Sequence, residues 1–88
     1  MPHTDYTDPE IEYPRLEARI QKIENEPDAY WLQVWLWSAP GERQEVFNRK
    51  RAGTYHDAHE IIGELSWKHH AVVGEDDIYV GHLPEQNS

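Results

Sequence analysis

The chain of 88 residues contains no cysteine. Disulfide bonds and zinc sites with thiolate ligands are therefore excluded, and a location in the cytoplasm is expected. No apolar run approaches the ~20 residues that a membrane helix needs. Residues 1–5 lack the basic segment followed by an apolar one that is typical of a signal peptide. We therefore expect a protein that does not associate with a membrane.

Basic side chains are scarce, with 8 Lys and Arg residues against 17 Asp and Glu residues and a formal net charge of −9. Such a balance opposes non-specific binding to nucleic acid and favours solubility. Three interpretations of the acidity stay open: a solvated surface, a source adapted to salt, or an acidic mimic of nucleic acid. A mimic would need carboxylates at phosphate-like spacing on one face of the fold.

Motifs that carry catalysis are missing. No serine lies in G-x-S-x-G, and the glycines form neither G-x-G-x-x-G nor a phosphate-binding loop. The segment from His59 begins like the zinc-protease motif H-E-x-x-H, but Gly63 stands where the second histidine belongs. We therefore predict that the protein is not an enzyme and uses no cofactor, since function must be argued from a site.

Six histidines raise the question of a metal site. His56 and His59 are suitably spaced for a ligand pair on a predicted helix. His70 would lie about 16 Å beyond His59 along the helix axis, too far for a shared ion held at ~2 Å. Further ligands would have to come from His82 or residues 75–77. Surface histidines are the favoured interpretation, and a small metal-assisted enzyme or metal-binding protein built on His56 and His59 is the alternative.

The segment from Tyr30 to Trp37 is the most informative part of the sequence. Read with the two-residue period of a β-strand, it is apolar or aromatic on both faces, whereas a half-buried strand alternates apolar with polar residues. One face carries Tyr30, Leu32, Val34 and Leu36, and the other carries Trp31, Gln33, Trp35 and Trp37. We predict a central strand over residues 29–38 whose aliphatic side packs on a helix. The other side of the sheet is called the tryptophan face.

Periodicity and turn residues predict two strands around this central one. Residues 15–21 alternate as a strand, with a helix as the alternative, and residues 24–28 form a turn. A Pro40-Gly41 turn leads into a return strand over residues 43–51. Its adjacent apolar residues, Val46 and Phe47, are expected to point to opposite faces.

The second half of the chain predicts a helix and a short strand. The helix spans residues 55–70, with Thr54 as N-cap and Asp57 in the place of a capping-box acid. Residues 75–77 are expected to form a solvated loop, and residues 78–80 a final strand parallel to its neighbour. The apolar stripe that would pack on the sheet comprises Ala58, Ile61, Ile62, Leu65 and Val72.

The order β-β-β-α-β predicts an α+β fold, in which one helix packs on one face of a four-stranded, mostly antiparallel sheet. The domain organisation follows from composition: an acidic flexible arm over residues 1–14, a single domain over residues 15–81 and a polar tail over residues 82–88. With the helix on one side, the tryptophan face remains open.

The tryptophan face is the candidate binding surface. Trp31, Trp35 and Trp37 lie on it, joined by Arg15 and Arg19 if the first strand pairs beside them. Arginine over indole contributes ~0.5–2 kcal/mol, and both residue types are enriched at interface hot spots. We predict binding to another protein here. A homodimer that buries the face and cover by the N-terminal arm stay open as alternatives.

The return strand would add Arg49 or Arg51 to this face if Phe47 also points there. Aromatic residues on a sheet near basic residues 49–51 fit the general logic of single-strand nucleic-acid binders. The net charge of −9 and the lack of a basic groove argue against that function, so nucleic acid is not an expected partner.

A second candidate surface lies on the outer side of the predicted helix, where His59, Gly63, Trp67 and His70 gather. Glycine inside a helix costs ~1 kcal/mol against alanine, so close approach of another backbone is one explanation for Gly63. A lone exposed tryptophan beside a tolerated glycine is the alternative.

These features together predict a non-enzymatic, small acidic module that binds another protein, as an adaptor or inhibitor. The layout is similar to that of many small α+β proteins that dock onto others, including phage-encoded and plasmid-encoded inhibitors. This similarity concerns size and shape and involves no motif.

Overall fold

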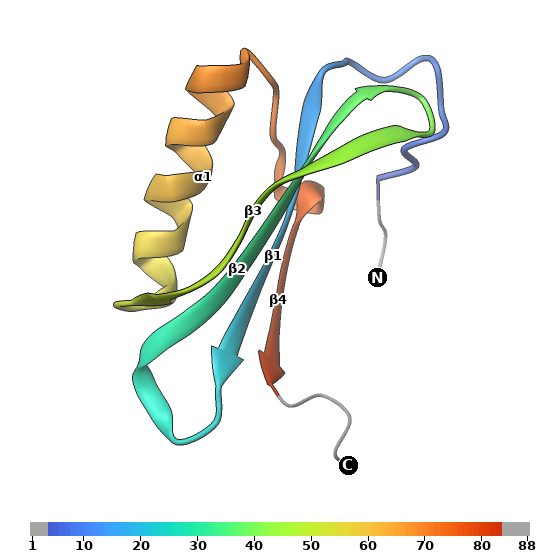
Figure 1. The fold of residues 1–88 in the computed structure, drawn as a ribbon. Coiled ribbons are helices and arrows are strands. Elements are labelled where there is room, and N and C mark those ends of the chain that lie inside the picture. Colours follow the sequence, from blue (N-terminus) through green and yellow to red (C-terminus); the bar gives the residue numbers. More distant parts are fainter. Residues whose placement is uncertain (1–3, 84–88) are drawn as a thin grey trace.

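The computed structural model describes residues 4–83, so residues 1–3 of the predicted arm and 84–88 of the predicted tail lie outside it. Its elements follow the predicted order, with a short 3₁₀ helix added before the last strand (Figure 1). In chain order they are β1 (Arg15–Ile23), β2 (Glu26–Ala39), β3 (Glu42–Ala52), α1 (Tyr55–His69), η1 (Glu75–Asp77) and β4 (Ile78–Leu83).

The four strands form one mixed sheet in the order β3-β2-β1-β4. β1 and β3 are antiparallel to β2, and β4 is parallel to β1. The predicted α+β fold, with a mostly antiparallel sheet and one helix on one face, is confirmed. The parallel direction of the last strand is confirmed as well, because the chain returns from α1 to the beginning of β1 before β4 starts. β4 extends past the predicted strand of residues 78–80.

The two hairpins differ from the predictions in one respect. β1 and β2 are joined by Glu24 and Asn25 alone, and Asn25 adopts a φ of 67°. Asparagine tolerates this left-handed conformation better than most residues. β2 therefore begins at Glu26, and the predicted turn over residues 24–28 is too long. In the second hairpin Gly41 has a φ of 76°, as the Pro-Gly turn requires.

A β-bulge in β3 decides which side chains reach each face. Val34 pairs with Phe47 and Trp35 pairs with Glu45, so Val46 has no direct counterpart on β2. Val46 and Phe47 both pack against the hydrophobic core. The prediction that they point to opposite faces is wrong, because the bulge shifts the alternation of the strand by one residue.

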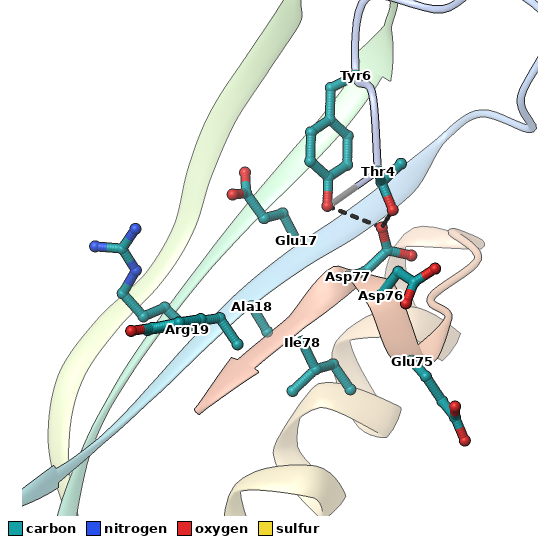
Figure 2. Close-up of a pocket in the computed structure, with 10 residues that line it drawn as sticks. Thr4, Tyr6, Glu17, Ala18, Arg19, Glu75, Asp76, Asp77 and Ile78 are labelled. Atoms are coloured by element: carbon teal, nitrogen blue, oxygen red, sulfur yellow. Dashed lines mark hydrogen bonds between the residues drawn. The ribbon is translucent and has the colours of Figure 1, made fainter. Parts of the chain in front are cut away.

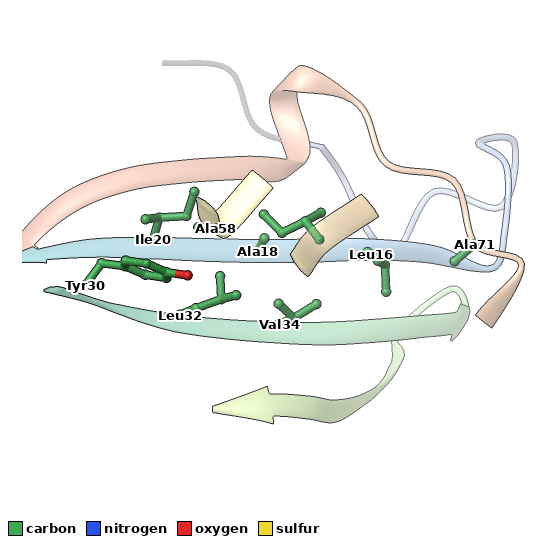
Figure 3. Packing of buried hydrophobic residues seen from close by; sticks show 9 residues of the cluster. Leu16, Ala18, Ile20, Tyr30, Leu32, Val34, Ala58 and Ala71 are labelled. Atoms are coloured by element: carbon green, nitrogen blue, oxygen red, sulfur yellow. The ribbon is translucent and has the colours of Figure 1, made fainter. Parts of the chain in front are cut away.

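The core lies between α1 and the strands β1 and β2 (Figure 3). Burial of each large aliphatic side chain contributes ~1.5–3 kcal/mol, so this layer is the main source of stability. Val72 of the predicted stripe lies beyond the helix, where it bridges to Arg15. The other stripe residues join the core from α1, namely Ala58, Ile61, Ile62 and Leu65. The sheet supplies Leu16, Ala18, Ile20, Tyr30, Leu32 and Val34.

The beginning of α1 forms as predicted. The Asp57 carboxylate accepts a hydrogen bond of 2.9 Å from the Thr54 amide, which completes the capping box. The helix ends at His69, one residue earlier than predicted, and His70 closes it with a φ of 53°. Within residues 4–83 no helix is long and apolar enough to cross a membrane.

Candidate functional site

The tryptophan face is the side of the sheet turned away from α1. In the register of the sheet, Trp37 lies between Arg15 on β1 and Arg43 on β3. The five site residues predicted from the sequence therefore share one face. The side chains of this face are Arg15, Glu17, Arg19 and Gln21 on β1, Trp31, Gln33, Trp35 and Trp37 on β2, Arg43, Glu45, Asn48 and Lys50 on β3, and Tyr79 on β4.

Two guanidinium groups flank Trp35 at the centre of the face. The Arg43 guanidinium carbon lies 4.7 Å from the Trp35 ring centroid, and that of Arg19 lies 5.9 Å away. Arg19 also lies 5.5 Å from the ring of Tyr79, and Arg43 lies 5.5 Å from that of Trp37. Each such contact at a partly exposed site contributes ~0.5–1 kcal/mol. Together they form a row of alternating aromatic and cationic groups across three strands and into β4.

Hydrogen bonds fix the orientation of the outer indoles. The Trp37 indole nitrogen donates to the Glu17 carboxylate at 2.9 Å, and the Trp31 indole nitrogen donates to the Asn48 side chain at 2.6 Å. Arg43 also donates to Glu17, at 3.3 Å. All three tryptophans are half-buried, so each presents part of its ring, and the indole nitrogens of Trp31 and Trp37 are satisfied by these hydrogen bonds.

Arg43 is a site residue that the sequence reasoning missed. The sequence predicts Arg49 or Arg51 on this face if Phe47 points there. Phe47 packs toward the core instead, and the Arg49 guanidinium lies 5.5 Å from its ring. The bulge reverses the assignment and brings Arg43 over the tryptophans. The adjacent apolar residues Val46 and Phe47 were the signal of a bulge, because they break the two-residue period.

The N-terminal arm, defined here as residues 4–14, covers one end of the tryptophan face. The Tyr6 ring stacks on Trp37 with ring centroids 4.6 Å apart and planes within 5° of parallel. Its backbone carbonyl accepts a hydrogen bond of 2.8 Å from the Gly41 amide. Cover by the arm, one of the alternatives from the sequence, therefore holds at Trp37. Flexibility of residues 1–14 stays a prediction.

The Asp77 side chain joins the N-terminal arm to β1 and to the turn before β4 through hydrogen bonds. Its side chain is fully buried, and one oxygen accepts hydrogen bonds from the hydroxyls of Thr4 at 2.7 Å and Tyr6 at 2.8 Å. The other oxygen accepts from the Gly74 amide at 2.7 Å and from the Arg15 guanidinium at 3.1 Å. The prediction of a solvated loop is wrong at Asp77, because η1 turns its carboxylate inward. Arg15 consequently serves as an ion-pair partner here.

The pKa values of Asp77 and Tyr6 follow from this arrangement. Burial tends to raise the pKa of the Asp77 carboxyl, but hydrogen bonds from Thr4, Gly74, Arg15 and Tyr6 outweigh it and hold that pKa below its usual range. Burial, followed by the bond to Asp77 and its charge, raises the pKa of the Tyr6 phenol. At neutral pH the carboxylate is therefore an acceptor and the phenol is a donor.

A pocket of about 450 Å³ lies between the arm, β1, η1 and β4 (Figure 2). Tyr6 and Tyr79 supply aromatic walls, and Glu17, Arg19 and Asp76 supply charged ones. The pocket adjoins the row of Arg19, Trp35 and Arg43. It is large enough to receive a side chain of a partner at the edge of the tryptophan face.

The second predicted surface lies on the opposite side of the molecule. Trp67 is 81% exposed there, and His59 and His70 are exposed as well. A Cβ added at Gly63 would meet no atom within 4 Å. The described part of the chain therefore gives no reason for a glycine at this position, and approach of another backbone stays a prediction.

The described residues place no further ligands beside His56 and His59, the pair proposed as the alternative metal site. Among the residues that the structure describes, no group of three or more His, Cys, Asp and Glu side chains is placed to hold a metal ion. His56 stacks on Tyr55 with ring centroids 4.4 Å apart, and His59 meets the same ring edge-on at 6.1 Å. The two histidines thus pack on an aromatic ring.

No protein-family model, curated protein or solved structure matches this chain. The geometry of the tryptophan face is therefore the basis on which its function is argued.

Proposed function

We propose that this chain is a non-enzymatic protein-binding module, an adaptor or inhibitor, whose contact surface is the tryptophan face. The observation that carries the proposal is the setting of Trp35, which lies between Arg19 and Arg43 on the side of the sheet away from α1. Tryptophan and arginine are the residue types that dominate interface hot spots. A cytoplasmic location is part of the proposal, and the lack of cysteine is compatible with it.

The fixed geometry of the face supports binding. The indole groups of Trp31 and Trp37 are already held by Asn48 and Glu17, so association would immobilise few additional rotamers. A flat row of aromatic rings on strands also offers large contact area at little conformational cost. These properties favour a surface that is preformed around Trp31 and Trp35, outside the end that the arm covers.

The charges of the face indicate the chemistry of the partner. Arg19, Arg43 and Lys50 are exposed here, on a protein whose formal net charge is −9. Arg43 and Lys50 also form exposed ion pairs with Glu17 and Glu26, which an acidic partner would have to share or replace. A guanidinium that stacks on an indole keeps its in-plane N–H donors for a carboxylate. We therefore expect a different protein that presents acidic side chains around an apolar centre. A second copy is less suitable, because two chains of this net charge repel each other.

Photo-crosslinking tests the proposal with a matched pair of positions. Tyr79 lies on the tryptophan face and is 44% exposed, whereas Trp67 lies on α1 and is 81% exposed. Benzoylphenylalanine is larger than either aromatic side chain, and the exposure of both positions leaves room for its additional benzoyl group. In cells that produce the protein, we expect a crosslink to another protein from position 79 and none from position 67.

Each other outcome has a distinct meaning. A crosslink from position 79 to a second copy would replace the partner by a homodimer on the same face. A crosslink to nucleic acid from that position would change the class of ligand. Crosslinking from position 67 alone would move the contact to the outer side of α1 and contradict the proposal.

A further inference from the structure

The arm holds the end of the tryptophan face through contacts to two side chains. The Tyr6 ring lies on Trp37, and the hydroxyls of Thr4 and Tyr6 bind one oxygen of Asp77. One backbone hydrogen bond joins this part of the arm to the sheet, from the Gly41 amide to the Tyr6 carbonyl, and a second holds the other end of the arm, from the Val72 amide to the Pro14 carbonyl. The attachment of Thr4 and Tyr6 is therefore local, and both residues line the pocket described above (Figure 2).

These contacts are separable from the rest of the fold. No residue of the arm belongs to the buried core between α1 and the sheet. If Thr4 and Tyr6 leave, Asp77 still accepts hydrogen bonds from Arg15 and from the Gly74 amide. Opening of the arm would leave this carboxylate paired and the core intact, which are the conditions for a local transition without unfolding.

The arm also carries the chemistry expected of a partner. It presents an aromatic ring to Trp37, and it contains four acidic side chains and no basic one, namely Asp5, Asp8, Glu10 and Glu12. The exposed cations of the tryptophan face would attract an acidic partner segment in the same way. An acidic partner and the arm therefore compete for one end of the face.

We propose that the arm is a strap that opens and closes over Trp37 while the sheet stays folded. The strap competes with a partner for Trp37, because a partner reaches the Trp37 ring only after the Tyr6 ring has left it. The inference rests on the proposed function, because it concerns access to the same face. Trp35 lies outside the strap, between Arg19 and Arg43, and is the point at which a partner binds first.

Native-state hydrogen exchange of the full chain tests the strap. The Gly41 amide reports closure, because it donates to the Tyr6 carbonyl, and the Leu32 amide in the central strand reports the folded sheet. In the unmodified protein, we expect the Gly41 amide to be protected but to exchange at least about tenfold faster than the Leu32 amide. The Tyr6→Ala variant should speed Gly41 exchange by at least a further ~10-fold, while the Leu32 amide still exchanges at least about tenfold more slowly than the Gly41 amide.

Two variants sharpen the measurement. Tyr6→Phe keeps the ring stack and removes the hydrogen bond to Asp77, so its Gly41 exchange should fall between those of the unmodified protein and Tyr6→Ala. Tyr55→Phe, on the helix side, is the matched control and should leave Gly41 exchange unchanged.

Two results would overturn the strap. If the Gly41 and Leu32 amides exchange at the same rate, the arm opens only when the whole protein unfolds. If Tyr6→Ala leaves Gly41 exchange unchanged, the arm is not what closes this end. Neither result involves a partner, so the strap can fail while the crosslink from position 79 still supports the tryptophan face.

Discussion

Tyr6 and Asp77 lie 71 residues apart in the sequence, and the Tyr6 hydroxyl donates a hydrogen bond of 2.8 Å to the Asp77 carboxylate. The same carboxylate holds Arg15 at the beginning of β1. One buried acid therefore ties the N-terminal arm, the first strand and the turn before the last strand together. A carboxylate with this many donors should govern how stability depends on pH.

Asp77 should stabilise the fold above its ordinary pKa of 3.8. Because its pKa in the folded protein is lower, this stabilisation is fully present above that value and is lost as the pH falls through the folded pKa. Asp77→Asn should lower the free energy of unfolding by roughly 2–4 kcal/mol near neutral pH, since it leaves Arg15 without its charged partner.

Urea denaturation followed by tryptophan fluorescence measures this difference. The stability gap between the unmodified protein and Asp77→Asn should be constant above about pH 5 and should narrow as the pH falls from about 4.5 to about 2. The other carboxylates are common to both proteins and cancel in the comparison. A gap that stays constant over this range would mean that Asp77 is not the acid responsible.

The contribution of the Tyr6 phenol to stability should have the opposite pH dependence from that of Asp77. Its pKa is raised above the ordinary value of 10.0, so its contribution to stability is present below that value and is lost as the pH rises. The difference in ultraviolet absorbance between the unmodified protein and Tyr6→Phe isolates this one phenol. Its ionisation should have a midpoint above 10.0, and a midpoint at the ordinary value would show that the ring is not held against Asp77.

Two glycines should respond to alanine with opposite signs. Gly63 lies inside α1 with open space around it, so Gly63→Ala should stabilise the protein by about 0.5–1 kcal/mol. Gly53 has a φ of 123°, and a Cβ there would collide with the Asp57 carboxylate that caps the helix. Gly53→Ala should cost about 1–3 kcal/mol. Thermal unfolding of the two variants checks the signs, and the same sign for both would contradict this description of α1.

Substitutions in the core should lower the stability of the protein, whereas substitutions on the exposed outer side of α1 should have little effect. Leu32 is fully buried between α1 and the sheet, so Leu32→Ala should lower the free energy of unfolding by about 2–5 kcal/mol. Trp67→Ala, at an exposed position, should change it by less than about 0.5 kcal/mol. Urea denaturation compares the two, and a large cost at Trp67 would mean that this side chain is part of the packed structure.

The fold can be predicted mainly from the periodic spacing of apolar residues along the sequence. The alternation of residues 15–21 and the helical stripe from Ala58 to Leu65 are dictated by burial on one side of each element, which the sequence records directly, and the two apolar faces of residues 29–38 indicate a central strand. Thr54 with Asp57 and the Pro40-Gly41 turn are local signals that need no knowledge of distant contacts. These predictions agree with the structure because each depends on residues close in sequence.

The parts that were missed depend on residues far apart or on register. Asp77 sits in an acidic run and resembles solvated side chains, and its partners Thr4, Tyr6 and Arg15 come from the other end of the chain. Arg43 was missed because the one-residue bulge at Val46 breaks the alternation of β3, so that Arg43 lies on the tryptophan face although Phe47 packs toward the core. Pairing across a sheet is set by the three-dimensional register, which composition and periodicity leave open.

The most direct test uses the partner protein that crosslinks to position 79. Its affinity is measured by calorimetry for the unmodified chain, for Trp35→Ala and for Trp67→Ala. Trp35→Ala removes the ring between Arg19 and Arg43, and we expect it to weaken binding by about 30-fold or more, the ~2 kcal/mol typical of a hot spot. Trp67→Ala, the matched control on α1, should bind as tightly as the unmodified protein. Unchanged affinity for Trp35→Ala, or a loss of affinity for Trp67→Ala alone, would contradict the assignment of the tryptophan face.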